Sequence, residues 1–238
     1  MHPDRVTAGT PAPSPRKALR VAPRNRPRLE AMEGRMLLTA ARVSVTAADV
    51  PQLIADIAQA NNRGGDSTIN LVPNATYTLK NTWSTTQDGL PAVNIPGGGT
   101  LTINGNGATV TRDQNGYGLR LLEVDGGTLV LNDLTLSGGK IACNDPRYGG
   151  GGLGVFGGAA VLKGVTVAGN EVDGQGSIIP TGGGIAVYDA SLTLDNCVVS
   201  DNTVSGTRGG GWAQGGGLYQ SGGSVSVGSL LGTDKIVR

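Results

Sequence analysis

Aromatic residues and histidine are scarce in this chain of 238 residues. Aromatic side chains make up only 3% of the sequence, so a hydrophobic core must be built from aliphatic residues. The only histidine is His2, close to the first residue. The sequence therefore excludes a catalytic histidine in the remainder of the chain.

Cysteine is also rare. The two cysteines, Cys143 and Cys197, have no spacing typical of a metal or redox site. Cys197 occupies an apolar position of the repeat described below, so we expect it in the core as a small hydrophobic side chain. Cys143 falls in a loop. A disulfide between the two stays open, because disulfide geometry is demanding.

The charge of the chain is small but unevenly distributed. Residues 1–36 hold eight Lys and Arg against three Asp and Glu, whereas residues 37–238 hold eleven against fifteen. The second part is therefore mildly acidic and carries no basic stripe of the kind that binds nucleic acid. We expect no nucleic-acid partner.

Glycine is the residue that the sequence has in excess, with 41 copies. Collagen is excluded, because glycine does not recur at every third position. Instead, glycine clusters with asparagine and aspartate between short apolar pairs. Residues 182–202 hold three such pairs, which are Ile185/Val187, Leu192/Leu194 and Cys197/Val199.

The same three pairs recur at intervals of 31 to 33 residues. Each pair has the two-residue period of a strand with one buried face. The equivalent positions form three aliphatic ladders, residues 122-153-185-218, 131-162-194-227 and 136-167-199. A fixed period with three short strands per repeat is typical of a solenoid.

Strands this short cannot bury a face alone, so successive repeats must stack with like strands parallel, about 4.8 Å apart. The sequence thus predicts an all-β chain folded as a parallel β-helix of about five coils, with regular coils from Val93. A β-sandwich and a glycine-rich disordered chain are the alternatives.

Two parts of the repeat resemble those of a known group of proteins. The start Gly-Gly-Gly-Ile-x-Val-Tyr at 182–188 and the end Ser200-Asp201-Asn202 are similar to repeats of bacterial right-handed parallel β-helix surface proteins. These include polymorphic outer-membrane-protein-type repeats and the wider pectin-lyase-like superfamily. The resemblance covers residues 43–238 and implies a right-handed parallel β-helix. This fold hosts lyases, hydrolases, adhesins and autotransporter passengers, so it implies no single activity.

Residues 1–42 form a separate basic tail by composition. Residues 1–28 are rich in proline and arginine and are predicted to be disordered. Residues 28–40 resemble the Leu-Glu-Pro-Arg-x-Leu-Leu segment of large bacterial surface proteins, with Gly34 in place of the proline. The matching residues are Glu33, Arg35, Leu37 and Leu38. The resemblance implies a sorting signal and a secreted or cell-surface location.

No transmembrane segment is predicted. The apolar run 36–41 is too short for an ordinary signal sequence or a membrane span. The predicted division of the chain is therefore a tail over 1–42 and one β-helix domain over 43–238.

The stretch 50–62 predicts a helix that caps the first coil. Asp49 is a suitable N-cap and Pro51 is tolerated in the first turn. Leu53, Ile54, Ile57 and Ala58 recur at helical spacing. The end of a solenoid needs such a cover for its core and strand edge, although a surface helix without this role is the alternative.

Three longer loops, 138–150, 169–182 and 203–215, leave from the same corner of successive coils. Stacking places them on one edge, where repeat proteins often bind ligands. Solvated connectors are the alternative. The candidate ligand-binding residues on this edge are Asp145, Arg147, Tyr148, Asp173, Arg208 and Trp212.

Phe156 and Tyr188 occupy equivalent outward positions one coil apart. They could form a small carbohydrate platform, and ordinary aromatic packing on a strand surface is the alternative.

No catalytic residue is predicted, because no ladder position holds carboxylates in adjacent coils, as acid–base chemistry in a solenoid would need. No metal site is predicted either. Calcium stays open only because Asp145 and Asp173 could meet across one coil. No other cofactor is expected.

These observations favour an exported, non-enzymatic β-helix module for cell-surface display or adhesion. Its partner would be a surface polysaccharide or another surface protein. The alternative is a polysaccharide lyase or hydrolase of the pectin-lyase-like superfamily. After Val227 the repeat pattern fails, so we also expect a fragment of a longer repeat protein or end-to-end self-association through the last coil.

Overall fold

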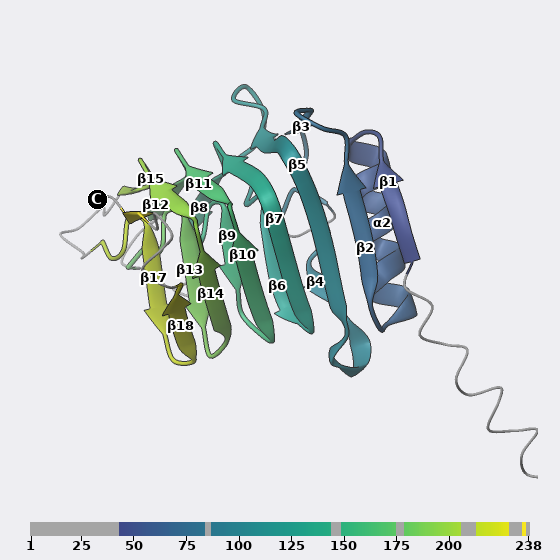
Figure 1. Ribbon diagram of the computed structural model, residues 1–238. Helices are drawn as coiled ribbons and strands as arrows, with labels where there is room; N and C mark the ends of the chain where they lie inside the picture. The colour runs from purple at the N-terminus through teal and green to yellow at the C-terminus, as the bar shows by residue number, and fades with distance from the viewer. Residues whose placement is uncertain are drawn as a thin grey trace, which may run out of the picture. The chain divides into compact units, whose positions relative to one another are not determined.

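The computed structural model describes residues 43–83, 87–143, 149–174, 179–205, 213–228 and 235–236. These residues form a parallel β-solenoid of about four turns with one α-helix near its N-terminal end (Figure 1). The predicted fold class is therefore confirmed. The sequence predicted about five coils. The structure has about four turns rather than five, because the strands at both ends belong to incomplete turns.

Three parallel sheets make up the solenoid, and we call them the long, second and third sheets. The long sheet has 11 strands: β1 (Val43–Ala47), β2 (Ser67–Leu71), β3 (Thr76–Leu79), β5 (Thr100–Arg112), β7 (Thr128–Ser137), β10 (Ala159–Lys163), β11 (Thr166–Ala168), β14 (Ser191–Asp195), β15 (Val198–Ser200), β18 (Ser224–Val227) and β19 (Lys235–Ile236). The second sheet contains β4 (Val93–Asn94), β6 (Leu122–Gly126), β9 (Leu153–Val155), β13 (Ile185–Tyr188) and β17 (Leu218–Ser221). The third contains β8 (Lys140–Cys143), β12 (Glu171–Gly174) and β16 (Thr203–Ser205).

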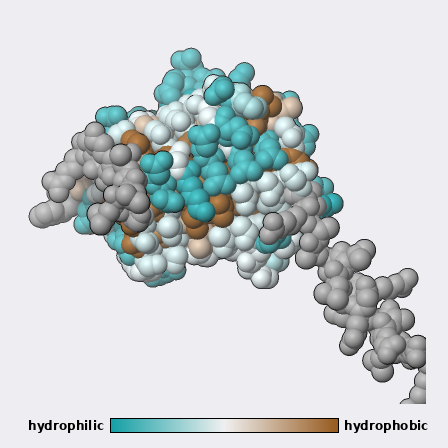
Figure 2. Space-filling model, viewed as in Figure 1, coloured by the Kyte–Doolittle hydropathy of each residue, from teal (hydrophilic) through white to brown (hydrophobic). Residues whose placement is uncertain are grey.

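The residues predicted to stack in each ladder are paired in the observed strand register. Leu131 pairs with Leu162, Leu162 with Leu194, and Leu194 with Val227. The ladders 122-153-185-218 and 136-167-199 are paired in the same way. Their side chains fill the interior, which is closed except at the last coil, where Val227 is 49% exposed. Because apolar side chains point inward, neutral and hydrophilic residues cover most of the surface seen in Figure 2.

The corners of the coils use residues that tolerate a left-handed backbone, as predicted. Asp133 and Asn196 have φ angles of 48° and 54° at equivalent corners of the long sheet. At another corner, Asn170 and Asn202 are buried and stacked, and the Asn170 Nδ2 donates to the Asn202 Oδ1 at 2.9 Å. Cys197 is buried as expected, whereas the side chain of Cys143 lies outside the described part of the structure.

The helix α2 (Val50–Arg63) covers the N-terminal end of the solenoid beside β1 and β2 (Figure 1). The backbone N–H of Gln52 donates to the Asp49 carboxylate at 2.9 Å, so the predicted N-cap is present. Leu53, Ile57 and Ala60 are buried in the core, which confirms the capping role. A short 3-10 turn, η1 (Pro96–Gly98), precedes β5. No helix among the described residues is both long and apolar enough to cross a membrane.

Candidate functional site

Of the six ligand-binding residues predicted on the loop edge, the structure describes only Asp173, which lies on β12. The remaining five, Asp145, Arg147, Tyr148, Arg208 and Trp212, lie outside the described residues. Asp173 borders a polar hollow of about 550 Å³, which we call the third-sheet groove. Its lining residues are Arg112, Gln114, Gly116, Gly118, Lys140, Ala142, Glu171 and Asp173.

The floor of the third-sheet groove follows from strand alternation. Ile141 on β8 and Val172 on β12 are fully buried, so the residues on either side of them point outward. Register places Lys140 beside Glu171, and the Lys140 Nζ lies 2.9 Å from the Glu171 Oε2. An ion pair therefore bridges two successive coils on the floor of the groove.

One wall of the groove is held by Arg112, the last residue of β5. Arg112 is 7% exposed as a residue, and its Nε donates to the Gly138 carbonyl at 3.0 Å. The two terminal nitrogens donate to the Asp113 carbonyl at 2.9 Å and to the Gln114 side chain at 3.0 Å. Because these bonds hold the turn after β5 against the third sheet, the wall is fixed rather than a loose loop.

The groove keeps a carboxylate ionised. The hydrogen bond from Lys140 lowers the pKa of Glu171 against the opposing effect of burial. A further hydrogen bond of 3.0 Å from the Ser205 hydroxyl and the charge of Arg112 lower this pKa as well. The groove thus presents an anionic acceptor beside a cationic donor. This chemistry suits a ligand rich in hydroxyl groups.

The predicted aromatic pair lies on the outer side of the second sheet. The ring centroids of Phe156 and Tyr188 are 5.7 Å apart, and those of Tyr188 and Tyr219 are 5.5 Å apart. The Tyr188 hydroxyl also bonds the Thr181 hydroxyl at 2.6 Å. We call the three rings the aromatic stripe. Tyr219 was missed because its register partner is Ala186, so it meets Tyr188 diagonally rather than within one ladder position.

The rings of this stripe are engaged with one another and with a cation. The tilted contacts fall in the range of ordinary aromatic packing. The Arg120 guanidinium lies over the Phe156 ring, 4.9 Å from its centroid. These contacts favour packing over an open carbohydrate platform, which stays a hypothesis.

Arg120 is the centre of a charged cluster that sequence reasoning did not find. It is 1% exposed and pairs with Asp88 at 2.7 Å and with Glu123. Its guanidinium also donates to the carbonyls of Gly149 and Gly150, each at 3.2 Å. Asp88 and Arg120 are 32 residues apart and pair as an isolated parallel β-bridge, so they share a ladder position that lies outside the three apolar pairs compared in the sequence.

A third carboxyl, that of Asp125 on β6, lies beside this cluster at the protein surface. Partial burial and then the charge of Asp88 raise its pKa, while Arg120 opposes the rise. Asp88 shares a ladder position with Arg120, whereas Glu123 follows Arg120 by three residues, so the two carboxylates converge without sharing a ladder position. An acid of raised pKa near a buried arginine is a recognisable candidate for acid–base chemistry.

Metal binding gains no support from the described part of the chain. It contains no group of three or more His, Cys, Asp or Glu side chains that could hold a metal ion. The calcium hypothesis joined Asp173 to Asp145, which lies outside the described residues, so it stays a prediction.

Comparisons with known proteins add no relative. No family model, no curated protein and no solved structure matches this chain. The fold and the geometry of its surfaces are therefore the basis for inferring function, and the chain is described as a parallel β-solenoid of about four turns.

Proposed function

We propose that this chain is an exported, non-enzymatic β-helix module for cell-surface display or adhesion, and that it holds a polysaccharide in the third-sheet groove. The resemblance of its repeats to right-handed β-helix surface proteins supports display, and the sorting-type segment 28–40 supports export. The observation that carries the binding proposal is the ion pair of Lys140 and Glu171 on the floor of a polar hollow of about 550 Å³.

The groove matches a saccharide in size and chemistry. Binding sites for small ligands occupy about 300–1,000 Å³, which leaves room here for a few sugar units. Hydroxyl groups both donate and accept, so they can bond the Lys140 ammonium and the Glu171 carboxylate together. The paired charges leave the floor near neutral, and this favours a neutral polymer over a strongly charged one.

A binding assay on immobilised polysaccharides tests the proposal. We expect the wild-type chain to be retained on at least one neutral polymer, such as a β-glucan or a xylan. The double variant Lys140→Ala/Glu171→Ala should lose about a hundredfold or more in affinity, because each of the two charge-assisted hydrogen bonds removed is worth about 1.5 kcal/mol or more.

The chain offers a matched control for this variant. Lys163 and Asp195 are register partners with opposite charges on the outer face of the long sheet, and both are exposed. Lys163→Ala/Asp195→Ala should bind as the wild type does. Equal loss in both double variants, or no retention on any polymer, would contradict a specific role for the groove.

One observation favours a second candidate function, a polysaccharide lyase or hydrolase. Asp125 has a raised pKa and lies close to Asp88 and Arg120. In this hypothesis Asp125 is the general acid or base, and the aromatic stripe borders the substrate. Chain cleavage by the wild type that disappears in Asp125→Asn would support it. Absence of cleavage from neutral and acidic polymers would refute it.

A further inference from the structure

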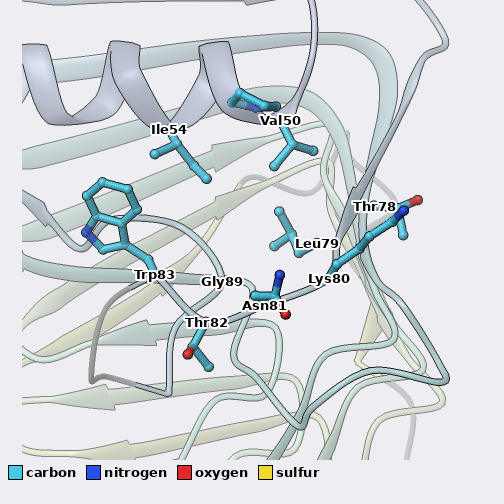
Figure 3. A pocket seen from close by; sticks show the side chains of 10 residues that line it. Val50, Ile54, Thr78, Leu79, Lys80, Asn81, Thr82, Trp83 and Gly89 are labelled. Carbon is cyan, nitrogen blue, oxygen red and sulfur yellow. The ribbon is translucent and has the colours of Figure 1, made fainter.

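An apolar pocket of about 330 Å³ lies at the N-terminal end of the solenoid, away from the third-sheet groove. We call it the cap pocket, and Figure 3 shows it. One wall is the first part of α2, where Val50 and Ile54 point toward Leu79. The indole of Trp83 lies beside Ile54. The complete lining consists of Val50, Pro51, Ile54, Thr78, Leu79, Lys80, Asn81, Thr82, Trp83 and Gly89.

The apolar face of α2 is wider than its capping role requires. Leu53, Ile57 and Ala60 bury themselves in the core, but Val50 and Ile54 are only half-buried. Their remaining surface faces the pocket instead of protein atoms. An apolar wall left open in this way costs free energy unless something else covers it.

Trp83 extends the same open apolar surface. Its side chain is 40% exposed, an unusual state for the largest apolar residue of a chain with few aromatic groups. The segment that carries it is fixed, because the backbone N–H of Trp83 donates to the Asp88 carbonyl at 2.6 Å. The backbone of Trp83 is therefore held at the edge of the pocket.

Polar groups line the rest of the rim. Lys80 and Asn81 are exposed, and Thr82 follows them. Within the described part of the chain, Asn81 makes no side-chain hydrogen bond and Lys80 makes no ion pair. In Figure 3 Asn81 lies below Leu79, between Trp83 and Lys80, whereas the side chains of Lys80 and Thr82 point away from the pocket. A ligand resting on the indole can thus reach the amide of Asn81 at its periphery.

We propose that the cap pocket binds one neutral pyranose ring at the end of a saccharide chain. A pyranose has a face of C–H bonds, whose positive edges suit the negative face of an indole. Its hydroxyl groups lie around the ring, where the side-chain amide of Asn81 can both donate to them and accept from them. A purely apolar ligand would leave this amide unused, and the flat face of a long polymer would not enter the hollow.

The inference rests on the proposed function in one respect, since it takes the ligand to be a saccharide. It adds a second binding site at the N-terminal end of the described solenoid, whereas β16 and β17 lie at the other end. Two sites on one rigid module would raise the overall affinity for a polymer that reaches both.

Tryptophan fluorescence tests the site directly. The chain has two tryptophans, so Trp212→Phe leaves Trp83 as the only one. We expect methyl glucoside, methyl galactoside or methyl N-acetylglucosaminide to shift the emission of Trp83 in a saturable way. The expected Kd is on the order of 1 mM, which is typical of a ligand of this size.

Two variants in this background identify the pocket as the source of the signal. Asn81→Ala should weaken binding about fivefold while leaving the melting temperature unchanged, because Asn81 is exposed. Ile54→Arg should abolish binding by filling the pocket. Val72→Arg is the matched control, since Val72 is a 37% exposed apolar residue outside the pocket.

The outcomes separate this inference from the proposed function. No emission shift with any of the three sugars, or a shift that persists in Ile54→Arg, would overturn the cap pocket. If the polymer is still retained and still depends on Lys140 and Glu171, the proposed function survives that result. An emission shift lost in Ile54→Arg, together with no polymer retention, would support the pocket and overturn polymer binding in the groove.

Discussion

Leu194 and Thr193 are neighbours in β14 with opposite environments. Leu194 is 1% exposed in the ladder 131-162-194-227, whereas Thr193 points outward and is half-exposed. Leu194→Asp would bury a carboxylate without a partner and should cost more than about 4 kcal/mol in the free energy of unfolding. Thr193→Asp should change it by about 0.5 kcal/mol. Chemical denaturation of both variants measures the difference, and equal stabilities would refute the inward and outward assignment.

Asp125 should make the stability depend on pH. A raised pKa means that folding disfavours the ionised carboxyl, mainly through partial burial and then the charge of Asp88. At pH 7 the ionised group therefore lowers the free energy of unfolding, and Asp125→Asn should raise the melting temperature. Well below the unfolded pKa of about 3.9 the carboxyl is protonated in the folded and unfolded states alike, so the gain should disappear toward pH 3.

Thermal melting of wild type and Asp125→Asn between pH 3 and pH 8 measures this effect. Asp113→Asn is a suitable control, because Asp113 lies in the turn after β5 and its Oδ1 accepts from the Asn115 N–H at 3.0 Å, a bond that an asparagine oxygen can keep. A gain for Asp125→Asn that is the same at pH 3 and pH 7 would show that removing the charge is not the cause.

The elements whose signals come from residues close together in the sequence could be predicted with the most accurate bounds. The helix expected over 50–62 is α2, Val50–Arg63, because its N-cap, proline and apolar spacing are all local signals. The strands of the regular coils could also be predicted, because the same apolar pairs recur in each repeat. Asp88 and Arg120 are one repeat apart and pair as a parallel β-bridge, but this polar position was not among the apolar pairs from which the ladders were built. The cap pocket escaped prediction because it combines α2 with the turn after β3.

The buried asparagines at one corner should hold the coils together. The Asn170 Oδ1 accepts from the Gly139 N–H at 2.9 Å, and its Nδ2 donates to the Leu136 carbonyl at 3.1 Å. Asn170→Ala would leave these buried groups without partners, so we expect a loss of about 2–4 kcal/mol. Denaturant unfolding measures it.

Asn132 provides the contrast for this prediction. Its side chain donates to the Asn104 Oδ1 at 2.9 Å on the outer face, where water can replace the bond. Asn132→Ala should therefore cost about 1 kcal/mol or less. A similar cost for both substitutions would mean that the buried corner has no special role in stability.

For the whole molecule, the period of the sequence determines how the coils stack but not what the surfaces bind. The aliphatic ladders repeat in every regular coil, so the period alone was enough to predict their register. The groups that distinguish the third-sheet groove from the other outer faces occur only once each. Arg112 is the last residue of β5 and holds the turn that follows, and Lys140 and Glu171 form their ion pair only when two coils stack. Such single features leave no periodic signal.

The central claim is that the solenoid holds a polysaccharide without cleaving it. Native electrophoresis through gels cast with a β-glucan, a xylan or a galacturonan tests both parts in one measurement, because binding retards the protein and cleavage clears the stained polymer along its track. We predict retardation by a neutral polymer, lost in Lys140→Ala/Glu171→Ala and kept in Lys163→Ala/Asp195→Ala, with no cleared track. Unretarded migration in every gel, or a cleared track that Asp125→Asn removes, would contradict the claim.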